Sequence, residues 1–517
     1  MEPAGLDLDD LAQDVDFSMG EGFERQRAEA AAVLQELDRR REARTMAVPT
    51  DTEQVKARLR ELGEPATLFA EGPGDRRERL KYVLGQIRQA RGEGDMEVEQ
   101  PSDDSSDSEE EEKEEEFYTP GSEELLLARR KIADFSLRRA RKRIARQKEE
   151  AKLPLSKVID TRKQSYSQIK KFSQLGSQIG DDRPVSLVRF SPNSKLLLTG
   201  SWTGNARVWD IPSCNLKTTY RGHGDRVGGV AWHPQATIGQ SEDAVNFVTG
   251  AADGLVKLWS LGSERSMATL QGHEARVGRV AFHPSGNYVG SASYDGTWRL
   301  WDVEKQKELL VQEGHSREVF ALAFQDDGSL AASGGWDAIG RVWDLRTGRT
   351  AMVLDGHVRE ILALDFAPNG YQIAAGSGDD SIRIWDIRAL KVAYTVPAHK
   401  SSVSDVRFFR SADEASLISA EDVSNAAKQG EMDVDVSGDN EDKPKPETTM
   451  SRSGLFLASS GFDHTVKVWS ADDWQLLTSL KTDEGKVMSV DVSGDGKTIA
   501  SGSYSRSFHL FMDVDSF

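Results

Sequence analysis

The segment GHEARVGRVAFHPSGNYVGSASYDGTWRLWD, residues 272–302, is the most regular of a series of related segments that fills the last two thirds of the chain. It begins with Gly-His and ends with Trp-Asp, and between them apolar and polar residues alternate around a Pro-Ser-Gly and an Asp-Gly turn. Alternation with a period of two, interrupted by such turns, is typical of short strands that are buried on one side. Each segment therefore predicts a small antiparallel sheet.

The positions of histidine and tryptophan give the period and the number of these units. The intervals from His273 to His315, from His315 to His357 and from His357 to His399 are each 42 residues. The unit-ending aromatic residues are Trp209, Trp259, Trp301, Trp343, Trp385, Trp469 and Phe511. Seven units of this size cannot bury their faces alone, whereas packing around a closed ring covers them. We therefore expect an all-β, seven-bladed propeller over residues 165–517.

Two units are longer than the others, and the last one is incomplete. The spacing from His399 to Trp469 predicts a long insertion at residues 411–453, and its richness in Glu, Asp, Ser and Lys predicts a disordered loop. Only Met512–Phe517 follows the third strand of the last unit. We therefore expect the segment around residues 165–175 to supply the missing outer strand and close the ring.

The repeats resemble those of the WD40 family, and the resemblance implies a structural role for their histidines and aspartates. In WD40 blades the Gly-His histidine, a strand Ser or Thr, an Asp and the Trp form a hydrogen-bonded tetrad, which satisfies polar groups that are costly to bury unpaired. The residues at the His and Asp positions include His223, His273, His315 and His357, with Asp253, Asp295, Asp337, Asp379 and Asp463. Once these are assigned, no metal-ligand spacing, phosphate-binding glycine loop or Ser/His/Asp arrangement remains. We expect no catalysis, cofactor, metal or small-molecule substrate.

Composition gives only broad limits. The chain has 517 residues, a formal net charge of -19 and one cysteine, Cys214, so an internal disulfide is excluded. A run of about 18 apolar residues, which a membrane-spanning helix needs, does not occur, and we expect no membrane association. The net charge hides local blocks of opposite sign, which have to be considered separately.

One end of the ring is rich in aromatic and arginine residues. The position before the tetrad Asp carries Trp202, Tyr294, Trp336, Phe462 and Tyr504, and arginines follow the His positions at Arg226, Arg276, Arg317 and Arg359. Aromatic and arginine side chains are enriched where proteins bind one another. These residues predict a protein-docking face. The alternative is that the aromatic rings cover neighbouring loops and the arginines are merely solvated.

Four segments precede the ring. Residues 1–49 predict an acidic leader and a helix, residues 50–92 a helical hairpin, residues 95–118 an acidic disordered tract and residues 119–153 a basic helix. The RNA-binding candidates of the basic helix are Arg138, Arg139, Arg141, Lys142, Arg143, Arg146 and Lys148. Such a cluster can surround phosphates. A solvated helix or a nuclear-import signal would have the same composition.

The run LRELGEPATLFAEGPGDRRERL, residues 59–80, resembles the splicing-factor motif of pre-mRNA-processing proteins, although Ala70 stands where that motif commonly has Gly. Together with SQIGDDRP at residues 177–184 and FSPNS at residues 190–194, it resembles the family of WD-repeat subunits of the U4/U6 small nuclear ribonucleoprotein. The resemblance implies a non-catalytic nuclear scaffold for pre-mRNA splicing. Its partners would be other U4/U6 proteins and U4/U6 snRNA, in the U4/U6 particle and the U4/U6-U5 tri-snRNP.

A different class of protein has to be considered as well. The boxes Trp343-Asp-Leu-Arg346 and Trp385-Asp-Ile-Arg388 are similar to those of WD40 substrate receptors of cullin-type ubiquitin ligases. Arginine after Trp-Asp-x is common in WD40 repeats, and this alternative leaves the motif at residues 59–80 unexplained.

Overall fold

The computed structural model describes residues 52–65, 72–90, 122–411, 450–482 and 485–513. The chain divides into two compact units, residues 1–116 and 117–517, which are treated separately here. The leader and helix predicted at residues 1–49, the acidic tract at 95–118 and most of the insertion at 411–453 lie outside the described residues.

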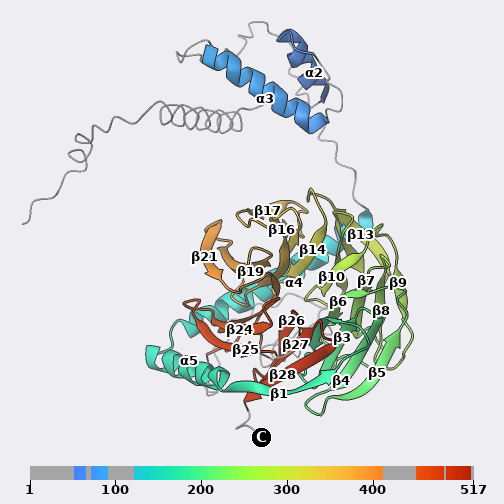
Figure 1. Ribbon diagram of the computed structural model, residues 1–517, viewed down its shortest axis with the longest axis vertical. Coiled ribbons are helices and arrows are strands. Elements are labelled where there is room, and N and C mark those ends of the chain that lie inside the picture. The colour runs from blue at the N-terminus through green and yellow to red at the C-terminus, as the bar shows by residue number, and fades with distance from the viewer. Residues whose placement is uncertain (1–51, 66–71, 91–121, 412–449, 483–484, 514–517) are drawn as a thin grey trace, which may run out of the picture. The chain divides into compact units, whose positions relative to one another are not determined.

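The larger unit contains seven four-stranded antiparallel sheets arranged as the blades of a ring (Figure 1). Blades 1 to 3 are β2 (Val185–Phe190), β3 (Leu196–Ser201), β4 (Asn205–Asp210) and β5 (Asn215–Arg221); β6 (Val227–Trp232), β7 (Phe247–Ala251), β8 (Val256–Trp259) and β9 (Ala268–Leu270); and β10 (Val277–Phe282), β11 (Tyr288–Ser293), β12 (Trp298–Asp302) and β13 (Lys307–Gln312). Blades 4 and 5 are β14 (Val319–Phe324), β15 (Leu330–Gly335), β16 (Gly340–Asp344) and β17 (Thr350–Leu354); and β18 (Ile361–Phe366), β19 (Gln372–Ser377), β20 (Ser381–Asp386) and β21 (Lys391–Pro397). Blades 6 and 7 are β22 (Val403–Phe408), β23 (Phe456–Gly461), β24 (Thr465–Ser470) and β25 (Leu476–Lys481); and β26 (Val487–Val492), β27 (Thr498–Ser503), β28 (Ser507–Asp513) and β1 (Phe172–Ile179). The seven-bladed propeller expected from the repeats is confirmed.

The ring is closed by a strand from the N-terminal side of the unit. β1 pairs antiparallel with β28, from Phe172 opposite Asp513 to Ile179 opposite Ser507. The strand expected around residues 165–175 thus begins only at Phe172, because the residues before it belong to helix α5 (Leu155–Lys170). Ile169 of that helix is buried in the core of blades 6 and 7, which holds the segment in a helix rather than a strand.

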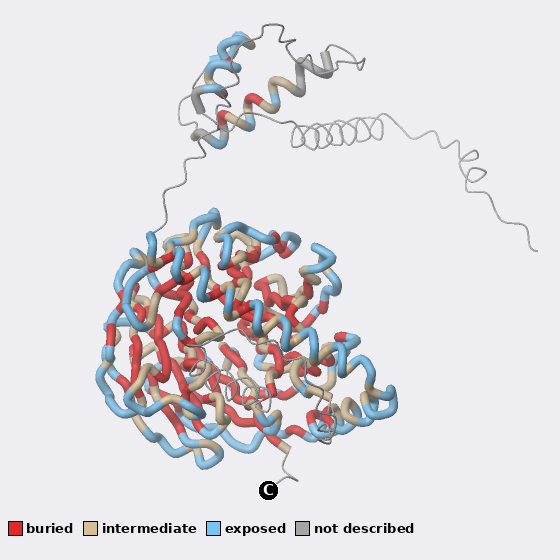
Figure 2. Tube along the Cα trace, turned by 180° about the vertical axis from the view of Figure 1, so that it is seen from behind, coloured by how far each residue is buried: buried red, intermediate tan, exposed pale blue. Residues whose placement is uncertain are grey.

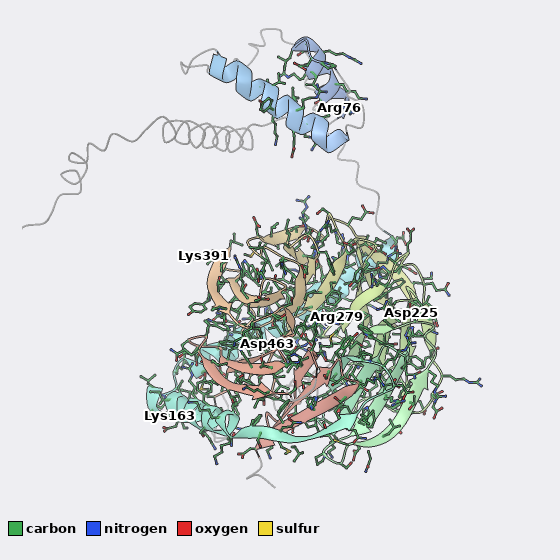
Figure 3. All side chains as sticks on the ribbon, viewed as in Figure 1. Arg76, Lys163, Asp225, Arg279, Lys391 and Asp463 are labelled. Atoms are coloured by element: carbon green, nitrogen blue, oxygen red, sulfur yellow. The ribbon has the colours of Figure 1, made fainter. Side chains whose placement is uncertain are left out.

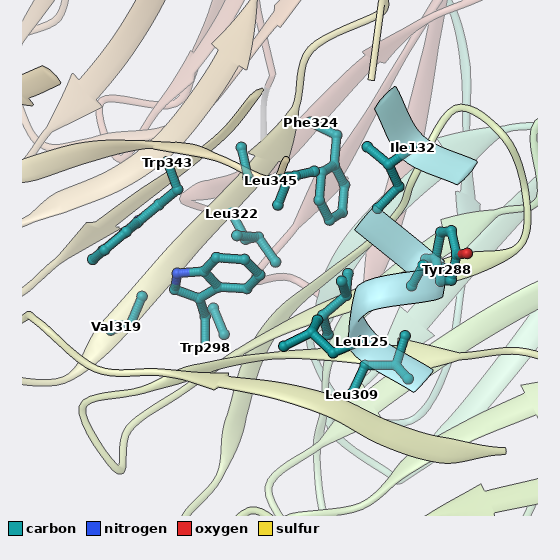
Figure 4. Packing of buried hydrophobic residues seen from close by; sticks show 14 residues of the cluster. Leu125, Ile132, Tyr288, Trp298, Leu309, Val319, Leu322, Phe324, Trp343 and Leu345 are labelled. Carbon is teal, nitrogen blue, oxygen red and sulfur yellow. The ribbon is translucent and has the colours of Figure 1, made fainter. Parts of the chain in front are cut away.

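The core of the ring lies between neighbouring blades. The second strand of every blade is largely buried along its length, whereas outer strands such as β1 and β21 are mostly exposed. Figure 4 shows one such cluster, in which Trp298 of blade 3 packs against Trp343 of blade 4. Large apolar side chains from adjacent blades therefore hold the ring together, at roughly 25 cal/mol for each Å² of apolar surface removed from water.

Antiparallel order places the turns of each blade on two opposite faces. The loop before the first strand and the turn between the second and third strands carry the tetrad His and Asp, and we call this the tetrad face. The turns between the first and second strands lie on the other side, together with helix α4 (Glu123–Glu150), and we call this the helix face. The insertion between β22 and β23 starts and ends on the helix face.

Helix α4 crosses the helix face of four blades (Figure 2). Ser122 caps its first turn by accepting a hydrogen bond from the backbone N–H of Leu125. Its buried residues recur at helical spacing and are Leu125, Ala128, Ile132 and Ser136. Leu125 and Ile132 enter the blade 3 and blade 4 core beside Trp298 (Figure 4). The helix is thus an integral part of the ring unit.

Salt bridges and hydrogen bonds fix the two ends of α4. Glu124 lies 3.4 Å from Lys305 in the turn after β12, and this lysine lowers the pKa of the glutamate. At the other end, Glu150 accepts a hydrogen bond from the backbone N–H of Ser451, at the edge of the long insertion. The path of α4 from blade 3 to blade 6 is therefore set by contacts at both termini.

The smaller unit contains the helical hairpin. Helices α2 (Thr52–Glu61) and α3 (Pro73–Ala90) pack through Val55, Leu59 and Leu80. Gly63 has a φ of 76°, which lets the chain leave α2 sharply. In the described part of both units, no helix has the length and apolar character needed to cross a membrane.

Candidate functional site

The tetrads are built as the sequence resemblance implied. In blade 3, His273 Nδ1 lies 2.7 Å from Asp295 Oδ2 and its Nε2 lies 2.7 Å from Ser291 Oγ, to which the Trp301 indole N–H donates. Corresponding chains join His223 to Asp253, His315 to Asp337 and His399 to Asp463. These histidines and aspartates are therefore engaged in hydrogen bonds that hold the turns of a blade together.

Burial and hydrogen bonding lower the pKa of both partners in a tetrad, but for different reasons. Burial is the main cause of a lowered pKa at His223, His357 and His399. Burial alone would raise the pKa of Asp379, but hydrogen bonds from Ser381 and His357 outweigh it and bring the pKa to about 2. At neutral pH the pairs His357–Asp379 and His399–Asp463 each consist of a neutral imidazole beside a carboxylate.

Three blades depart from the pattern: Thr203 in blade 1 and Ser505 in blade 7 stand at the Asp position, as the sequence shows, and two further exchanges were missed. In blade 5, Ala375 stands where the other tetrads have Ser or Thr, so His357 Nε2 is buried without a hydrogen-bond partner. In blade 1, Asp181 occupies the His position and Thr203 the Asp position, and the two side chains hydrogen-bond each other. Arg207 then pairs with Asp181 at 3.0 Å. Aligning every repeat position by position would have revealed Ala375 and Asp181.

The aromatic residues of the tetrad face differ in exposure. Trp336 and Tyr504 are exposed, at 40% and 48%. Trp202, Tyr294 and Phe462 are half-buried. Three cations lie over the half-buried rings: Arg226 over Trp202 at 5.1 Å, Arg276 over Tyr294 at 4.2 Å and Lys486 over Phe462 at 5.1 Å. The half-buried rings and the cations stacked on them form a packed layer, which we call the aromatic layer. Trp336 and Tyr504 beside it have aromatic surface exposed to solvent.

A cavity of about 220 Å³ opens within this aromatic layer at the mouth of the central channel. Phe320, Leu362 and Met488 contribute apolar wall, and Arg279 lies behind them, toward the centre of the ring (Figure 3). Burial lowers the pKa of Arg279 to about 10, and the guanidinium stacks over Phe320 at 4.7 Å. The sequence analysis missed these residues, although they lie at or near the second position of the first strand in each repeat.

The remaining two predicted docking residues are Arg317 and Arg359. Both are exposed on the loops that lead into β14 and β18. In the described residues neither stacks on an aromatic ring, in contrast to Arg226 and Arg276. They therefore lie on the tetrad face outside the aromatic layer.

Helix α4 separates its basic residues into two groups. Arg139, Arg143 and Arg146 face the ring, and Arg143 pairs with Asp327 at 2.8 Å and donates to the backbone carbonyl of Asn369. The predicted residues that stay exposed are Arg138, Arg141, Lys142 and Lys148. Arg138 also pairs with Asp134, one turn earlier, at 2.8 Å. The seven predicted RNA-binding residues are thus not brought to one surface.

No described group of three or more His, Cys, Asp or Glu side chains is arranged to hold a metal ion. The arginines of the two Trp-Asp-x-Arg boxes are also engaged within their own blades. Arg346 forks onto Asp344 and Arg388 onto Asp386, each two residues earlier, and Arg388 lies over the ring of Tyr371. Both boxes therefore have a local structural use.

Seven blades joined by tetrads and closed by an N-terminal strand define a WD-repeat β-propeller. The family model for the WD domain, G-beta repeat, matches seven segments that together cover just over half of the chain: residues 172–210, 214–260, 264–302, 306–344, 348–386, 448–470 and 474–511. The chain therefore belongs to the WD40-repeat family. Earlier in the sequence, a second family model, described as pre-mRNA processing factor 4 (PRP4) like, matches residues 55–83, within the helical hairpin.

Several curated proteins that this chain resembles are U4/U6 small nuclear ribonucleoproteins by name. The U4/U6 small nuclear ribonucleoprotein Prp4 of Bos taurus is 41% identical over 245 residues, which are 47% of this chain and 46% of that protein. The human protein of the same name is 41% identical over 237 residues, 45% of each chain. The Saccharomyces cerevisiae protein U4/U6 small nuclear ribonucleoprotein PRP4 is 32% identical over 221 residues, 41% of this chain and 45% of that protein. The chain spans about half the length of these curated relatives.

Proposed function

We propose that this protein is a non-catalytic scaffold subunit of the U4/U6 small nuclear ribonucleoprotein and of the U4/U6-U5 tri-snRNP, acting in pre-mRNA splicing in the nucleus. The observation that carries the proposal is the joining, on one chain, of a PRP4-like hairpin at residues 55–83 to a seven-bladed WD40 ring. The names of the relatives support the same assignment. Its partners are other proteins of the particle and U4/U6 snRNA.

The scaffold role is supported by how the reactive side chains are used. The tetrad histidines and aspartates bond to one another, as in the 2.7 Å contact of His273 with Asp295. The His273 side chain and Ser291 are also fully buried, so they position loops and are out of reach of a substrate. The ring then works by presenting two differently built faces to its partners.

We assign protein docking to the tetrad face. Its aromatic layer surrounds a small apolar cavity, and two further aromatic side chains, Trp336 and Tyr504, are exposed beside it. Buried aromatic anchors next to arginines are the usual high-energy elements of protein interfaces. RNA contact falls to the exposed side of α4, where Arg138, Arg141, Lys142 and Lys148 present cations that phosphates can reach.

Affinity purification of the full chain from nuclear extract tests the overall assignment. We expect U4 and U6 snRNA and the proteins of the particle to copurify. Recovery of cullin-type ligase subunits without these RNAs would overturn the proposal in favour of the substrate-receptor alternative. No structural observation favours that alternative, because Arg346 and Arg388 are bonded to Asp344 and Asp386.

Alanine substitution at Trp336 and Tyr294 tests the docking face. The double variant removes one exposed and one half-buried aromatic ring, and we expect recovery of partner proteins to fall about tenfold or more, as loss of hot-spot residues predicts. Tyr394→Ala is the matched control, because Tyr394 is 48% exposed but lies on outer strand β21. Undiminished recovery by the folded double variant would argue against this face.

Two triple variants test RNA contact, and in each of them three basic residues of α4 are replaced by glutamine. Replacing Arg138, Arg141 and Lys148 should weaken binding of U4/U6 RNA and reduce its salt dependence, because these side chains are exposed. Replacing Arg139, Arg143 and Arg146 removes the same charge from the side that faces the ring. If the inward set costs as much RNA affinity as the outward set in a folded protein, the outer surface of α4 is not the contact.

A further inference from the structure

A cavity larger than the one on the tetrad face lies at the other end of the channel, beneath α4. It has a volume of about 720 Å³ and is bounded by the inner strands of the blades and by the side of α4 that faces the ring. Volumes of this size are typical of sites for small molecules. The protein-docking face lies outside it, and of the exposed basic residues of α4 predicted to bind RNA only Lys142 lines it.

The wall of this cavity carries a surplus of positive charge. Seven cationic side chains face four carboxylates: Arg139, Lys142, Arg143, Arg146, Arg189, Arg407 and Arg410 against Asp326, Asp327, Asp365 and Asp491. Four of the cations come from α4 and three from the channel wall. A cavity with low-dielectric walls concentrates the field of such a surplus and favours anions inside it.

Most of the carboxylates are already matched to particular arginines. Arg410 bonds to both oxygens of Asp365 at 2.9 Å and reaches Asp326 at 3.0 Å. Arg143 pairs with Asp327 at 2.8 Å. Because of these bonds, few carboxylate oxygens remain as partners for the other cations of the cavity wall.

Arg407 on β22 is the cation left without a bond. Its guanidinium donates no hydrogen bond to any described residue, and its Nε is buried. The nearest carboxylate oxygen belongs to Asp365, at 3.8 Å, and that carboxylate is occupied by Arg410. Burial lowers the pKa of Arg407 and repulsion from Arg189 acts in the same direction, while attraction to nearby carboxylates opposes them. Because 28% of the Arg407 side chain is exposed, an anion inside the cavity can reach this guanidinium.

We propose that this cavity is a binding site for a compact polyanion, a small molecule with several phosphate groups, in which Arg407 forms the bidentate contact. A guanidinium presents its N–H groups in a planar fork that fits two phosphate oxygens. Arg139, Lys142 and Arg146 of α4 line the same cavity and supply charge at its entrance. Because α4 lines this cavity together with the blades, we take a compact ligand as its occupant, and an extended nucleic-acid strand is the alternative that the test distinguishes.

Calorimetric titration of the full chain with inorganic tripolyphosphate tests the proposal. We expect saturable binding that weakens with salt, and a loss of about 10- to 100-fold in Arg407→Gln, since a charge-assisted bidentate contact is removed. Arg221→Gln, at an exposed position on β5, removes the same charge far from the cavity wall and should bind like the wild type. Absence of saturable binding, or equal binding by Arg407→Gln, overturns the proposal.

A second variant at position 407 and a second ligand separate loss of the guanidinium contact from misfolding and from RNA binding. Arg407→Lys retains the positive charge and serves as a second variant if Arg407→Gln does not fold. We expect Arg407→Lys to bind tripolyphosphate about tenfold more weakly than the wild type. Unchanged affinity in Arg407→Lys would also overturn the proposal. A single-stranded RNA oligonucleotide is the comparison ligand, and Arg407→Gln should leave its affinity unchanged. An equal loss of RNA binding would assign the cavity to RNA instead of a compact polyanion.

Discussion

At the scale of single residues, the tetrads show how one absent hydroxyl changes a blade. Blades 3 and 4 have Ser291 and Ser333 between histidine and tryptophan, and both serines accept an indole hydrogen bond at 2.8 Å. Blade 5 has Ala375 at that position, and its His357 keeps only the contact with Asp379. The rest of the polar chain is intact, so a single oxygen atom separates blade 5 from a complete tetrad.

Ala375→Ser should therefore stabilise the protein. The new hydroxyl would give His357 Nε2 the hydrogen-bond partner that it now lacks, and the expected gain is about 1 kcal/mol in the free energy of unfolding. Ala374→Ser is the control, because Ala374 is equally buried but points to the other side of the strand, where a hydroxyl finds no tetrad. Chemical denaturation measures both variants. A loss of stability in Ala375→Ser would contradict the prediction.

Two buried histidines on the helix face make the ring sensitive to acid. Burial lowers the pKa of His233 and of His283 to about 4, and each ring accepts a backbone N–H at Nδ1, from Gln235 and Ser285 respectively, which requires a neutral ring. Because the folded pKa lies below the unfolded value of about 6.5, stability is full above pH 6.5 and falls as the pH drops toward 4. At pH 5 each histidine should cost about 2 kcal/mol relative to pH 7.

Replacing both histidines with glutamine should remove much of this acid sensitivity. Blade 4 shows that glutamine fits this repeat position, since Gln325 donates to the Gly370 carbonyl at 2.6 Å. We expect the His233→Gln, His283→Gln double variant to have a flatter dependence of unfolding free energy on pH between 7 and 4. His464→Gln, at an exposed position, should leave the slope as it is. An unchanged slope in the double variant would show that other groups cause the loss of stability in acid.

At the scale of secondary-structure elements, the strands followed from the sequence more directly than α4 did. Alternation and turn residues between His273 and Trp301 mark each strand, because one unit buries its faces in the same way as the next. For α4 the dense charge obscured the contact side. Leu125 and Ile132 carry the helical periodicity, but the groove that receives them is formed by blades more than 150 residues later in the chain. Long-range packing of this kind leaves no local signal.

The apolar contacts of α4, rather than its charges, should hold it on the ring. Ile132 is 1% exposed, and Ile132→Asp would bury a carboxylate in the blade 3 and blade 4 core. We expect residues 123–150 to exchange backbone hydrogens much faster while the blades stay protected. Leu137→Asp is the control, because Leu137 lies on the same helix and is 51% exposed. Equal protection of α4 in both variants would contradict this account.

At the scale of the whole molecule, closure depends on one strand that is otherwise exposed. Seven of the eight residues of β1 are exposed, so its contribution lies mainly in backbone pairing with β28. Replacing residues 172–179 with a Gly-Ser linker of the same length should lower the melting temperature by many degrees and expose the β28 edge to aggregation. The same replacement at residues 52–59, in the other unit, should leave the melting of the ring unchanged. Equal melting of the two variants would show that the blades close without β1.

The pairing of β1 with β28 also sets the order in which the protein can be made. Phe172 meets Asp513, and a ribosome adding about 5 to 20 residues per second separates their synthesis by on the order of 20 to 70 s. During that interval β1 has no partner, and the completed blades form an open arc with an unpaired strand edge at each end. Contacts this distant in sequence make the last step of folding slow. A nascent chain of this protein is therefore a natural client for chaperones that shield unpaired strands.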